Sequence, residues 1–202
     1  MKRLFNMLVA CLAVVAFAGA EEQEQSGVPA KMTVITGKEV PVFLQSLQEG
    51  KLVFQIYRRP KNIPLRDISK VTRLDFLNEF DREGVTQLFN AGDYQGVVEK
   101  MTADLTPSLD EYWQYMLIEN DFQNEFYYLM TAYLELDDLE NAEMAVSILT
   151  QSSNPEIYTK AMTASIKMDL AKGDIEGAEM KLGNIDSEVG KLYLREIGRA
   201  HV

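Results

Sequence analysis

Carboxylates are the side chains of this sequence most able to do chemistry. Asp110 and Glu111 are adjacent, and Asp137, Asp138 and Glu140 form a second group. Two such acids could act as the acid/base pair of a hydrolase of wall polysaccharide, or could ligate calcium. Acids at helix starts also cap free backbone amides and interact favourably with the helix dipole. No D-x-[DN]-x-[DN]-G loop frames either group, which favours the capping interpretation.

The sequence contains almost no histidine or cysteine for catalysis or metal binding. The only cysteine is Cys11 and the only histidine is His201. Neither a G-x-x-x-x-G-K-[ST] loop nor a G-x-G-x-x-G turn occurs in the sequence. We therefore expect no catalytic residue, no metal and no cofactor, and predict a protein that is not an enzyme.

A basic stretch, Tyr57-Arg58-Arg59-Pro60-Lys61, could bind an anionic polymer through Arg58, Arg59 and Lys61. The plainer interpretation is a solvated hairpin tip. Polyanion or nucleic-acid binding is therefore kept as an alternative function, and the export signal at the start of the chain argues against nucleic acid as a partner.

The first twenty residues have a basic start, an apolar run and an A-x-A site, which is typical of a secretory signal. We expect residues 1–20 to be removed, with Ala18 and Ala20 forming the site before Glu21. A transmembrane helix is an alternative, but the apolar run is shorter than the ~20 residues that a span needs. A lipoprotein anchored at Cys11 is the second alternative. The prediction is a periplasmic or secreted protein with no membrane span in its mature form.

Two further segments are set apart from the fold. Residues 21–30, EEQEQSGVPA, are acidic and then small, and we expect a flexible linker. The last six residues, IGRAHV, are what a common sequencing-library adapter encodes. We therefore expect 197–202 to be adapter read-through and the natural protein to continue beyond it.

Residues 31–76 have a β pattern. Short runs rich in Val, Ile, Phe, Thr and Leu alternate with turn residues, as in MTVIT, VPVFLQSL, KLVFQIY, NIPL and KVTRLDF. Five short strands in one small unit predict a closed antiparallel barrel, because closure removes exposed edges. The piece from Ile63 to Ile68 resembles the short turn before the last strand of SH3-like and Sm-like barrels.

Residues 77–196 change to a helical period. A motif recurs there as GDYQGVVEKM at 92–101, DDLENAEMAV at 137–146 and GDIEGAEMKL at 173–182. Each copy begins with a polar turn, and the aligned positions Val97, Ala142 and Ala178 are expected where two helices cross closely. Repeats of this length indicate stacked helix pairs, in which no pair buries its apolar face alone.

This region resembles the tetratricopeptide repeat, which carries a Gly-Asp-Tyr-type turn, an alanine after it and a closing proline. Gly92-Asp93-Tyr94 with Pro107 and Gly173-Asp174-Ile175 with Ala178 match this pattern. Tyr133, Ala142 and Pro155 match the middle copy. Val97 in place of a small residue, Asp169 in place of an aromatic one and the long first spacing depart from it. The segment 108–135 is expected to use that spacing for an additional or extended helix.

The resemblance implies a ligand groove lined by the first helix of each pair. Carried over, its positions are Asn124, Tyr127 and Thr131 in the second copy and Lys160, Thr163 and Lys167 in the third. Most of the aromatic residues between Tyr112 and Tyr133 are expected to be core.

Charge is divided unevenly. Residues 27–75 carry nine basic and four acidic side chains, whereas 76–196 carry eight basic and 24 acidic ones. The basic barrel could therefore dock on the acidic repeats, of its own chain or another. The sequence as a whole predicts an α+β protein, an SH3-like or Sm-like barrel followed by a tetratricopeptide-like solenoid. Its expected function is an exported scaffold that binds a protein or peptide, and the acidic repeats favour basic or amphipathic partners.

Overall fold

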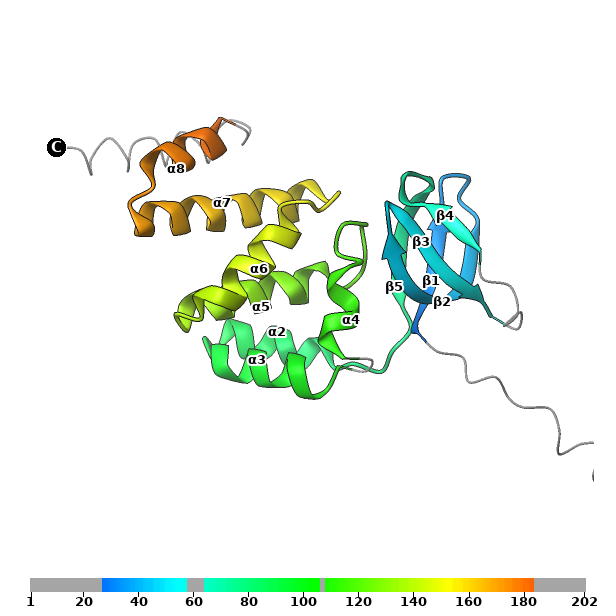
Figure 1. Ribbon diagram of the computed structural model, residues 1–202. Coiled ribbons are helices and arrows are strands. Elements are labelled where there is room, and N and C mark those ends of the chain that lie inside the picture. The colour runs from blue at the N-terminus through cyan, green and yellow to red at the C-terminus, as the bar shows by residue number, and fades with distance from the viewer. Residues whose placement is uncertain (1–26, 58–63, 106–107, 184–202) are drawn as a thin grey trace, which may run out of the picture.

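The chain belongs to the α+β class. The computed structural model describes residues 27–57, 64–105 and 108–183. In this part of the chain a five-stranded antiparallel sheet comes first and seven helices follow it (Figure 1). The predicted order, a β unit and then a helical unit, is confirmed at the level of fold class.

The strands lie where the alternating apolar pattern predicts them. Their bounds are β1 Val28–Val34, β2 Glu39–Gln48, β3 Lys51–Ile56, β4 Leu65–Asp67 and β5 Val71–Phe76. In β1 every second side chain is buried, and in β3 Leu52 and Phe54 are buried in the same core. This period of two places one face of each strand on the interior.

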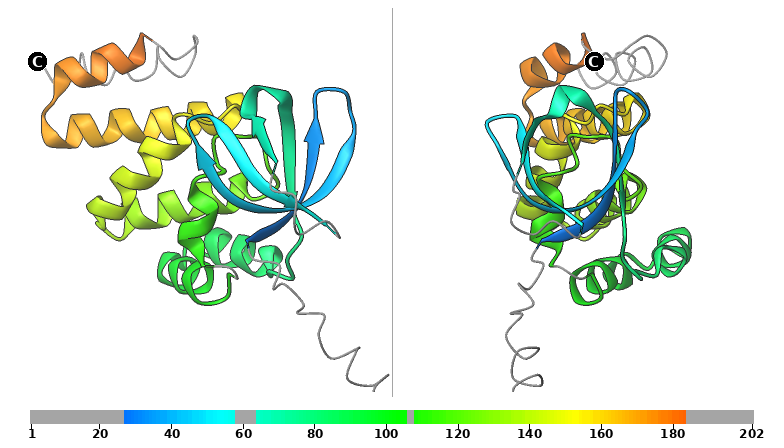
Figure 2. Two further views of the ribbon diagram at one scale, coloured as in Figure 1. Left: turned by 45° about the vertical axis from the view of Figure 1, so that its right-hand side comes forward. Right: turned by 90° about the vertical axis from the view of Figure 1, so that its right-hand side faces the viewer.

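The strand order is β4-β3-β2-β1-β5. The register shifts between Leu44 and Ser46 in β2, and an additional residue in one strand increases its local twist and bend. The 3-10 helix η1, Ile68–Lys70, joins β4 to β5, and Asp67 caps it by accepting the Ser69 amide at 2.9 Å. Figure 2 shows the resulting sheet to be strongly curved.

Strand β1 begins inside the segment that the sequence predicts to be a linker. Residues 21–26 lie outside the described part of the chain, but Val28 and Ala30 are fully buried in the sheet. Pro29 is compatible with this because proline is tolerated at the first positions of a strand. The sheet therefore starts before the expected boundary at Lys31.

The helices pack as three hairpins, α2–α3, α5–α6 and α7–α8, and each hairpin also contacts the next one along the chain. The bounds of the seven described helices are α2 Arg82–Asn90, α3 Tyr94–Ala103, α4 Leu109–Trp113, α5 Gln123–Glu135, α6 Leu139–Leu149, α7 Pro155–Lys172 and α8 Ile175–Leu182. Sheet and helices share one apolar core, and a second, smaller cluster lies between α7 and α8.

The three repeated motifs form the three hairpin turns. In each turn a residue with positive φ ends the first helix; these residues are Gly92, Asp137 and Gly173, with φ of 73°, 57° and 77°. The next residue is an aspartate whose amide donates to a carbonyl five positions earlier, at 2.8 to 3.0 Å. This is the Schellman arrangement, which satisfies the free carbonyls at a helix end.

The same aspartates, Asp93, Asp138 and Asp174, begin the second helix of each hairpin. Each carboxylate accepts the backbone amide three positions later, which is the usual N-cap. The bond is 3.0 Å to Gly96 and 2.9 Å to Gly177, where a Cβ would collide with the carboxylate. Val97, Ala142 and Ala178 each come one residue after the amide that the aspartate caps. All three are 0% exposed, which agrees with the prediction that two helices cross closely at these residues.

A fourth copy of the cap occurs at the start of α2. Asp81 has φ −78° and ψ 80°, close to the other capping aspartates, and its side chain accepts the Gly84 amide at 2.9 Å. Val85 follows and is 0% exposed. An aspartate cap followed four residues later by a buried Val or Ala is therefore a property of helix starts here and not only of hairpin turns.

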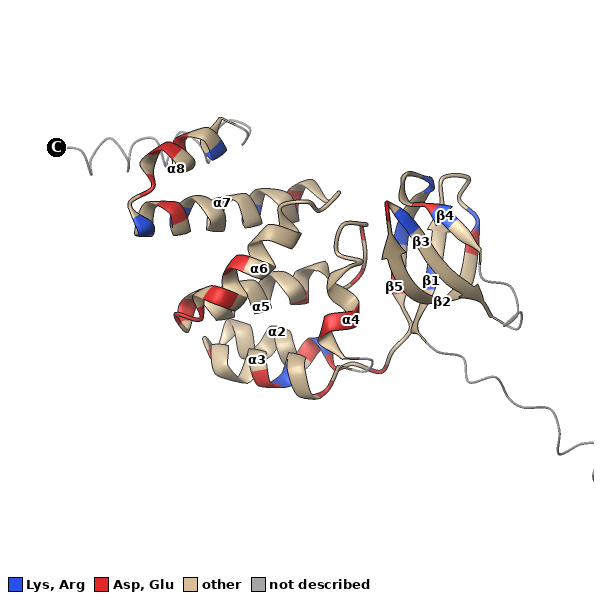
Figure 3. Ribbon diagram, in the orientation of Figure 1, with Lys and Arg blue, Asp and Glu red and all other residues tan. Residues whose placement is uncertain are grey.

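Surface charge differs between the two parts of the fold. Figure 3 shows acidic residues spread over the helices and basic ones gathered at one end of the sheet. Among the basic residues of this part, Lys51 and Arg66 lie in the β3–β4 ladder, Lys70 ends η1, and Lys38 lies in the turn between β1 and β2. Backbone hydrogen bonds from Ile35 to Lys70 and from Ile68 to Gly50 tie the turns there together.

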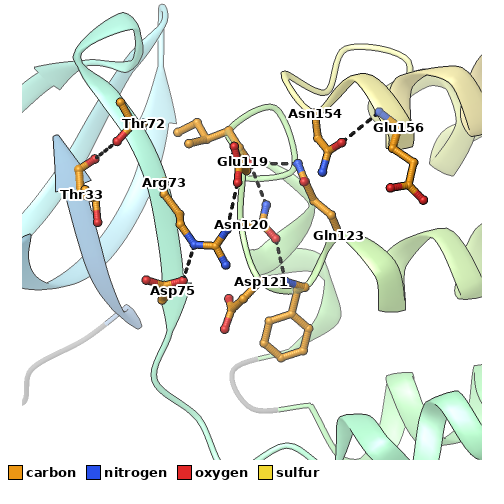
Figure 4. A network of polar contacts seen from close by, with 12 residues as sticks. Thr33, Thr72, Arg73, Asp75, Glu119, Asn120, Asp121, Gln123, Asn154 and Glu156 are labelled. Atoms are coloured by element: carbon orange, nitrogen blue, oxygen red, sulfur yellow. Dashed lines mark hydrogen bonds and ion pairs between the residues drawn. The ribbon is translucent and has the colours of Figure 1, made fainter. Parts of the chain in front are cut away.

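The long first spacing of the repeat is filled by α4 and the loop after it, which attaches the sheet to the helices. Leu74 of β5 donates its amide to the Glu119 carbonyl at 2.9 Å and accepts the Asp121 amide at 3.3 Å. The Asp121 carboxylate accepts the Phe76 amide, and Arg73 reaches Glu119 at 2.9 Å (Figure 4). The loop thus continues the sheet beyond β5.

Buried amides hold this loop in place. Asn120 donates to the Ile118 carbonyl at 2.8 Å and accepts the Phe122 amide at 2.9 Å. Gln123 donates to the Ser152 hydroxyl at 2.9 Å, which links the loop to the turn before α7.

No helix among the described residues combines the length and apolar character that a membrane span requires.

Candidate binding groove

A groove runs between helices α5 and α7, with the turn before α6 at one end. Its volume is about 380 Å³. The lining residues are Tyr127, Met130, Thr131, Leu134, Glu135, Asp137, Leu139, Lys160, Thr163, Ala164, Lys167, Met168, Ala171 and Lys172. The set combines an apolar floor with charged side chains at the rim.

Side-chain size explains why the groove opens here and not between α2 and α5. There, Phe89 of α2 stacks on Tyr128 of α5 with ring centroids 4.2 Å apart, and the large rings fill the space. Between α5 and α7 the facing residues include Thr131, Thr163 and Ala164, which are small. Two helix backbones held apart by neighbouring hairpins leave a hollow where short side chains meet.

One end of the groove is closed by an aromatic ring and an ammonium group. The Lys160 Nζ lies 4.7 Å from the centroid of the Tyr127 ring, a cation–π distance. Glu156 pairs with the same ammonium at 2.7 Å, and this contact lowers the pKa of the Glu156 carboxyl. Tyr127 is therefore held against α7 as well as within α5.

The basic and acidic residues of the rim lie on different segments. Lys160, Lys167 and Lys172 follow one another along α7, while Glu135 and Asp137 stand at the end of α5. Lys172 is paired with Glu143 of α6. Lys167 is exposed and makes no ion pair or hydrogen bond with any described residue.

The structure brings together five of the six positions that the repeat resemblance assigns to partner binding. Tyr127, Thr131, Lys160, Thr163 and Lys167 all line the groove. Asn124 is exposed one turn earlier on α5 and is not among the lining residues.

Sequence reasoning missed the apolar floor. Its members Met130 and Leu134 stand three residues after the predicted positions Tyr127 and Thr131, so they share that face of α5, whereas Met168 directly follows Lys167. The spacing of three could have identified the two members on α5.

The acids considered for hydrolysis or calcium binding do not converge. Asp110 and Glu111 are exposed in the first turn of α4, and Asp138 caps α6. Asp137 lies at the groove end, and Glu140 is exposed in the first turn of α6. Among the residues that the structure describes, no three acids, histidines or cysteines are placed to hold a metal ion.

The most unusual acid is Glu125 of α5, which is 6% exposed. Burial raises the pKa of its carboxyl, and no described group hydrogen-bonds its buried Oε2 atom. It faces the core beside Asp121 of the loop that pairs with β5, and it does not line the groove.

Several predicted positions lie outside the described residues. These are the signal segment 1–20 with Cys11, Ala18 and Ala20, the residue Glu21, the basic residues Arg58, Arg59 and Lys61, the closing Pro107 and the terminal segment 197–202. They remain predictions from the sequence.

No protein-family model, no curated protein and no solved structure matches this chain.

Proposed function

We propose that this chain is an exported, non-enzymatic scaffold that binds a segment of another protein or peptide in the α5–α7 groove. In this proposal the curved sheet is a small SH3-like barrel and the helices are a tetratricopeptide-like array. The observation that carries the proposal is that five of six positions expected to contact a partner line a single apolar groove.

The size of the groove suits side chains of a polypeptide. A volume of about 380 Å³ falls at the lower end of the range of about 300–1,000 Å³ for ligand sites. The walls include Met130, Leu134 and Met168, and flexible methionine side chains adapt to partners of different shape. Thr163 adds a hydroxyl group that can bond a partner's backbone, and the Thr131 hydroxyl, which donates to the Tyr127 carbonyl at 3.0 Å, can still accept a partner's amide.

The attachment of the sheet supports a scaffold role. The loop from Gln114 to Phe122 bonds β2, β5 and the helices at once, including a 2.9 Å bond from the Leu47 amide to the Gln114 side chain. A groove on helices held this way is preorganised, which reduces the entropy lost on binding.

The hydrolase alternative finds less support in the arrangement of acids, because Asp138 serves as a helix cap and Asp110 and Glu111 lie in an exposed first turn. Polyanion binding through Arg58, Arg59 and Lys61 remains a sequence-based alternative. Export to the periplasm or cell exterior is part of the proposal and rests on residues 1–20.

A groove-filling substitution tests the proposal. A displayed library of random peptides would be selected on the full chain, and the affinities of the selected peptides measured by fluorescence polarisation. Thr163→Trp places an indole in the groove, while Thr102→Trp makes the same change at an exposed site of α3.

We expect Thr163→Trp to weaken selected peptides at least about tenfold and Thr102→Trp to leave them unchanged. Equal binding by both variants, with unchanged circular dichroism, would contradict the proposal.

A further inference from the structure

We infer that the groove selects an amphipathic segment with acidic side chains facing α7, although the helical part of the chain is itself strongly acidic. This inference rests on the proposed function of the groove. It reverses the expectation from overall charge, under which basic partners would be favoured.

The placement of the basic residues carries the inference. The described residues between 76 and 183 contain six basic side chains, namely Arg82, Lys100, Lys160, Lys167, Lys172 and Lys181. Three of them line the groove.

The other three are paired elsewhere. Arg82 contacts Asp121 at 2.6 Å, and Lys181 contacts Asp169 at 2.6 Å. Lys100 lies between Asp81 and Asp104, at 3.1 and 3.3 Å. Lys160 and Lys172 are also paired, with Glu156 and Glu143, so Lys167 in the groove is the one basic side chain of these six without an acidic partner among the described residues.

Lys167 is the side chain most available to a partner. It is exposed at the middle of the groove and has no ion-pair partner among the described residues. Lys160 and Lys172 each already have one acid, Glu156 and Glu143. A partner carboxylate would thus meet an uncompensated ammonium first at Lys167.

Helix geometry sets the spacing of the partner's acids. Lys160 and Lys167 are two turns apart on α7, which is about 10 Å at about 1.5 Å per residue. Carboxylates two turns apart on a bound helix, or about three residues apart on an extended segment, match that distance. Apolar residues of the same segment would face Met130 and Met168.

The acidic end of the groove gives the segment a direction. Glu135 and Asp137 lie there, and Leu139 beside them is 51% exposed. The partner's acidic residues therefore belong near Lys160 and Lys167, and an apolar or basic residue near Leu139.

Repulsion from the acidic helices does not cancel this preference. At physiological salt the Debye length is about 8 Å, so distant exposed charges are largely screened. A carboxylate inside the groove would meet Lys167 at contact distance, where screening is much weaker.

The test uses the full chain and the library-selected peptides whose binding is lost in Thr163→Trp. Their affinities would be measured against the unmodified protein, Lys167→Glu and a matched control, Lys38→Glu. Lys38 is exposed in the turn between β1 and β2, makes no ion pair among the described residues, and gives the same change of net charge.

The inference predicts that groove-dependent peptides are rich in Asp and Glu. The affinity of these peptides should be about tenfold or more lower for Lys167→Glu, and it should differ by less than about twofold for Lys38→Glu. Peptides in which Glu is changed to Lys should regain affinity for Lys167→Glu. Neutral or basic groove-dependent peptides that bind Lys167→Glu equally well would overturn the inference and leave the proposed function standing. An absence of any groove-dependent peptide would overturn both.

Discussion

Lys160 of α7 lies over the ring of Tyr127 of α5, with its Nζ 4.7 Å from the ring centroid. Both side chains line the groove, so this contact sets the distance between its two walls at one end. Tyr127 is supported from behind by Phe89 of α2, whose ring centroid is 6.3 Å away. The wall of the groove therefore depends on an aromatic cluster that spans two hairpins.

Removing the Tyr127 ring should weaken the binding of peptides in the groove. Tyr127→Ala deletes a groove wall and the cation–π contact, which is worth about 0.5–1 kcal/mol at an exposed site. We expect about tenfold weaker binding of groove-dependent peptides. Tyr127→Phe keeps the ring and should bind within about twofold of the unmodified protein. If Tyr127→Ala binds as tightly as Tyr127→Phe in fluorescence polarisation, the ring is not part of the site.

Asp137 should be replaceable by glycine with a gain in stability. Its φ of 57° is left-handed, and glycine occupies the equivalent turn positions Gly92 and Gly173. A residue with a Cβ costs about 1 kcal/mol more than glycine in such a conformation. Asp137→Gly should raise the free energy of unfolding by roughly that amount, and Gly173→Ala should lower it similarly. Urea titrations in which the two substitutions shift stability in the same direction would show that the hairpin turns are not equivalent.

Asn120 should be essential to the attachment of the sheet. Its buried side chain bonds the Ile118 carbonyl and the Phe122 amide, and leaving these groups unpaired costs about 1–3 kcal/mol. Asn120→Ala should therefore lower the free energy of unfolding by about that much, whereas Asn90→Ala, at an exposed position of α2, should change it by less than about 0.5 kcal/mol. Chemical denaturation followed by the fluorescence of Trp113, which is buried near this loop, would measure both. Equal stabilities of the two variants would show that the loop is not held by Asn120.

Glu125 should make the protein less stable as pH rises through the acid range. Burial raises the pKa of this carboxyl in the folded state above its unfolded value near 4.5. The folded state then binds the proton more tightly, so stability falls as pH increases from the unfolded pKa through the raised one. Glu125→Gln cannot ionise and should be more stable than the unmodified protein at pH 7, by about 1 kcal/mol.

The difference between Glu125→Gln and the unmodified protein should disappear below the unfolded pKa. Thermal melts at a series of pH values would show this, with Glu111→Gln, at an exposed residue of α4, as the control. A gain for Glu125→Gln that is constant with pH would mean that ionisation is not its cause.

Local patterns in the sequence predict much of this fold because they act over a few residues. The alternation in β3 and the Gly-Asp turns at Gly92 and Gly173 each specify a strand or a helix boundary through neighbouring side chains. The groove positions Tyr127 and Thr163 also follow, since the repeat register places them on the first helices.

Other features depend on contacts between distant segments. Leu74 pairs with the loop at Glu119 and Asp121 through backbone atoms, so no side-chain pattern predicts this contact. Asn124 does not line the groove as predicted, because the groove begins only at Tyr127, whose ring contacts Lys160. The unpaired ammonium of Lys167 could not be predicted from net charge, because contacts with acids of other segments decide which lysines are available.

Amide chemical-shift mapping of the full chain with a library-selected peptide tests the binding site most directly. Binding between α5 and α7 predicts that the largest shifts in the nitrogen-proton spectrum come from residues such as Thr131, Thr163 and Lys167, with β2, β3 and α3 almost unmoved. Largest shifts in the sheet or on α3, with these three amides unchanged, would contradict a binding site in the groove.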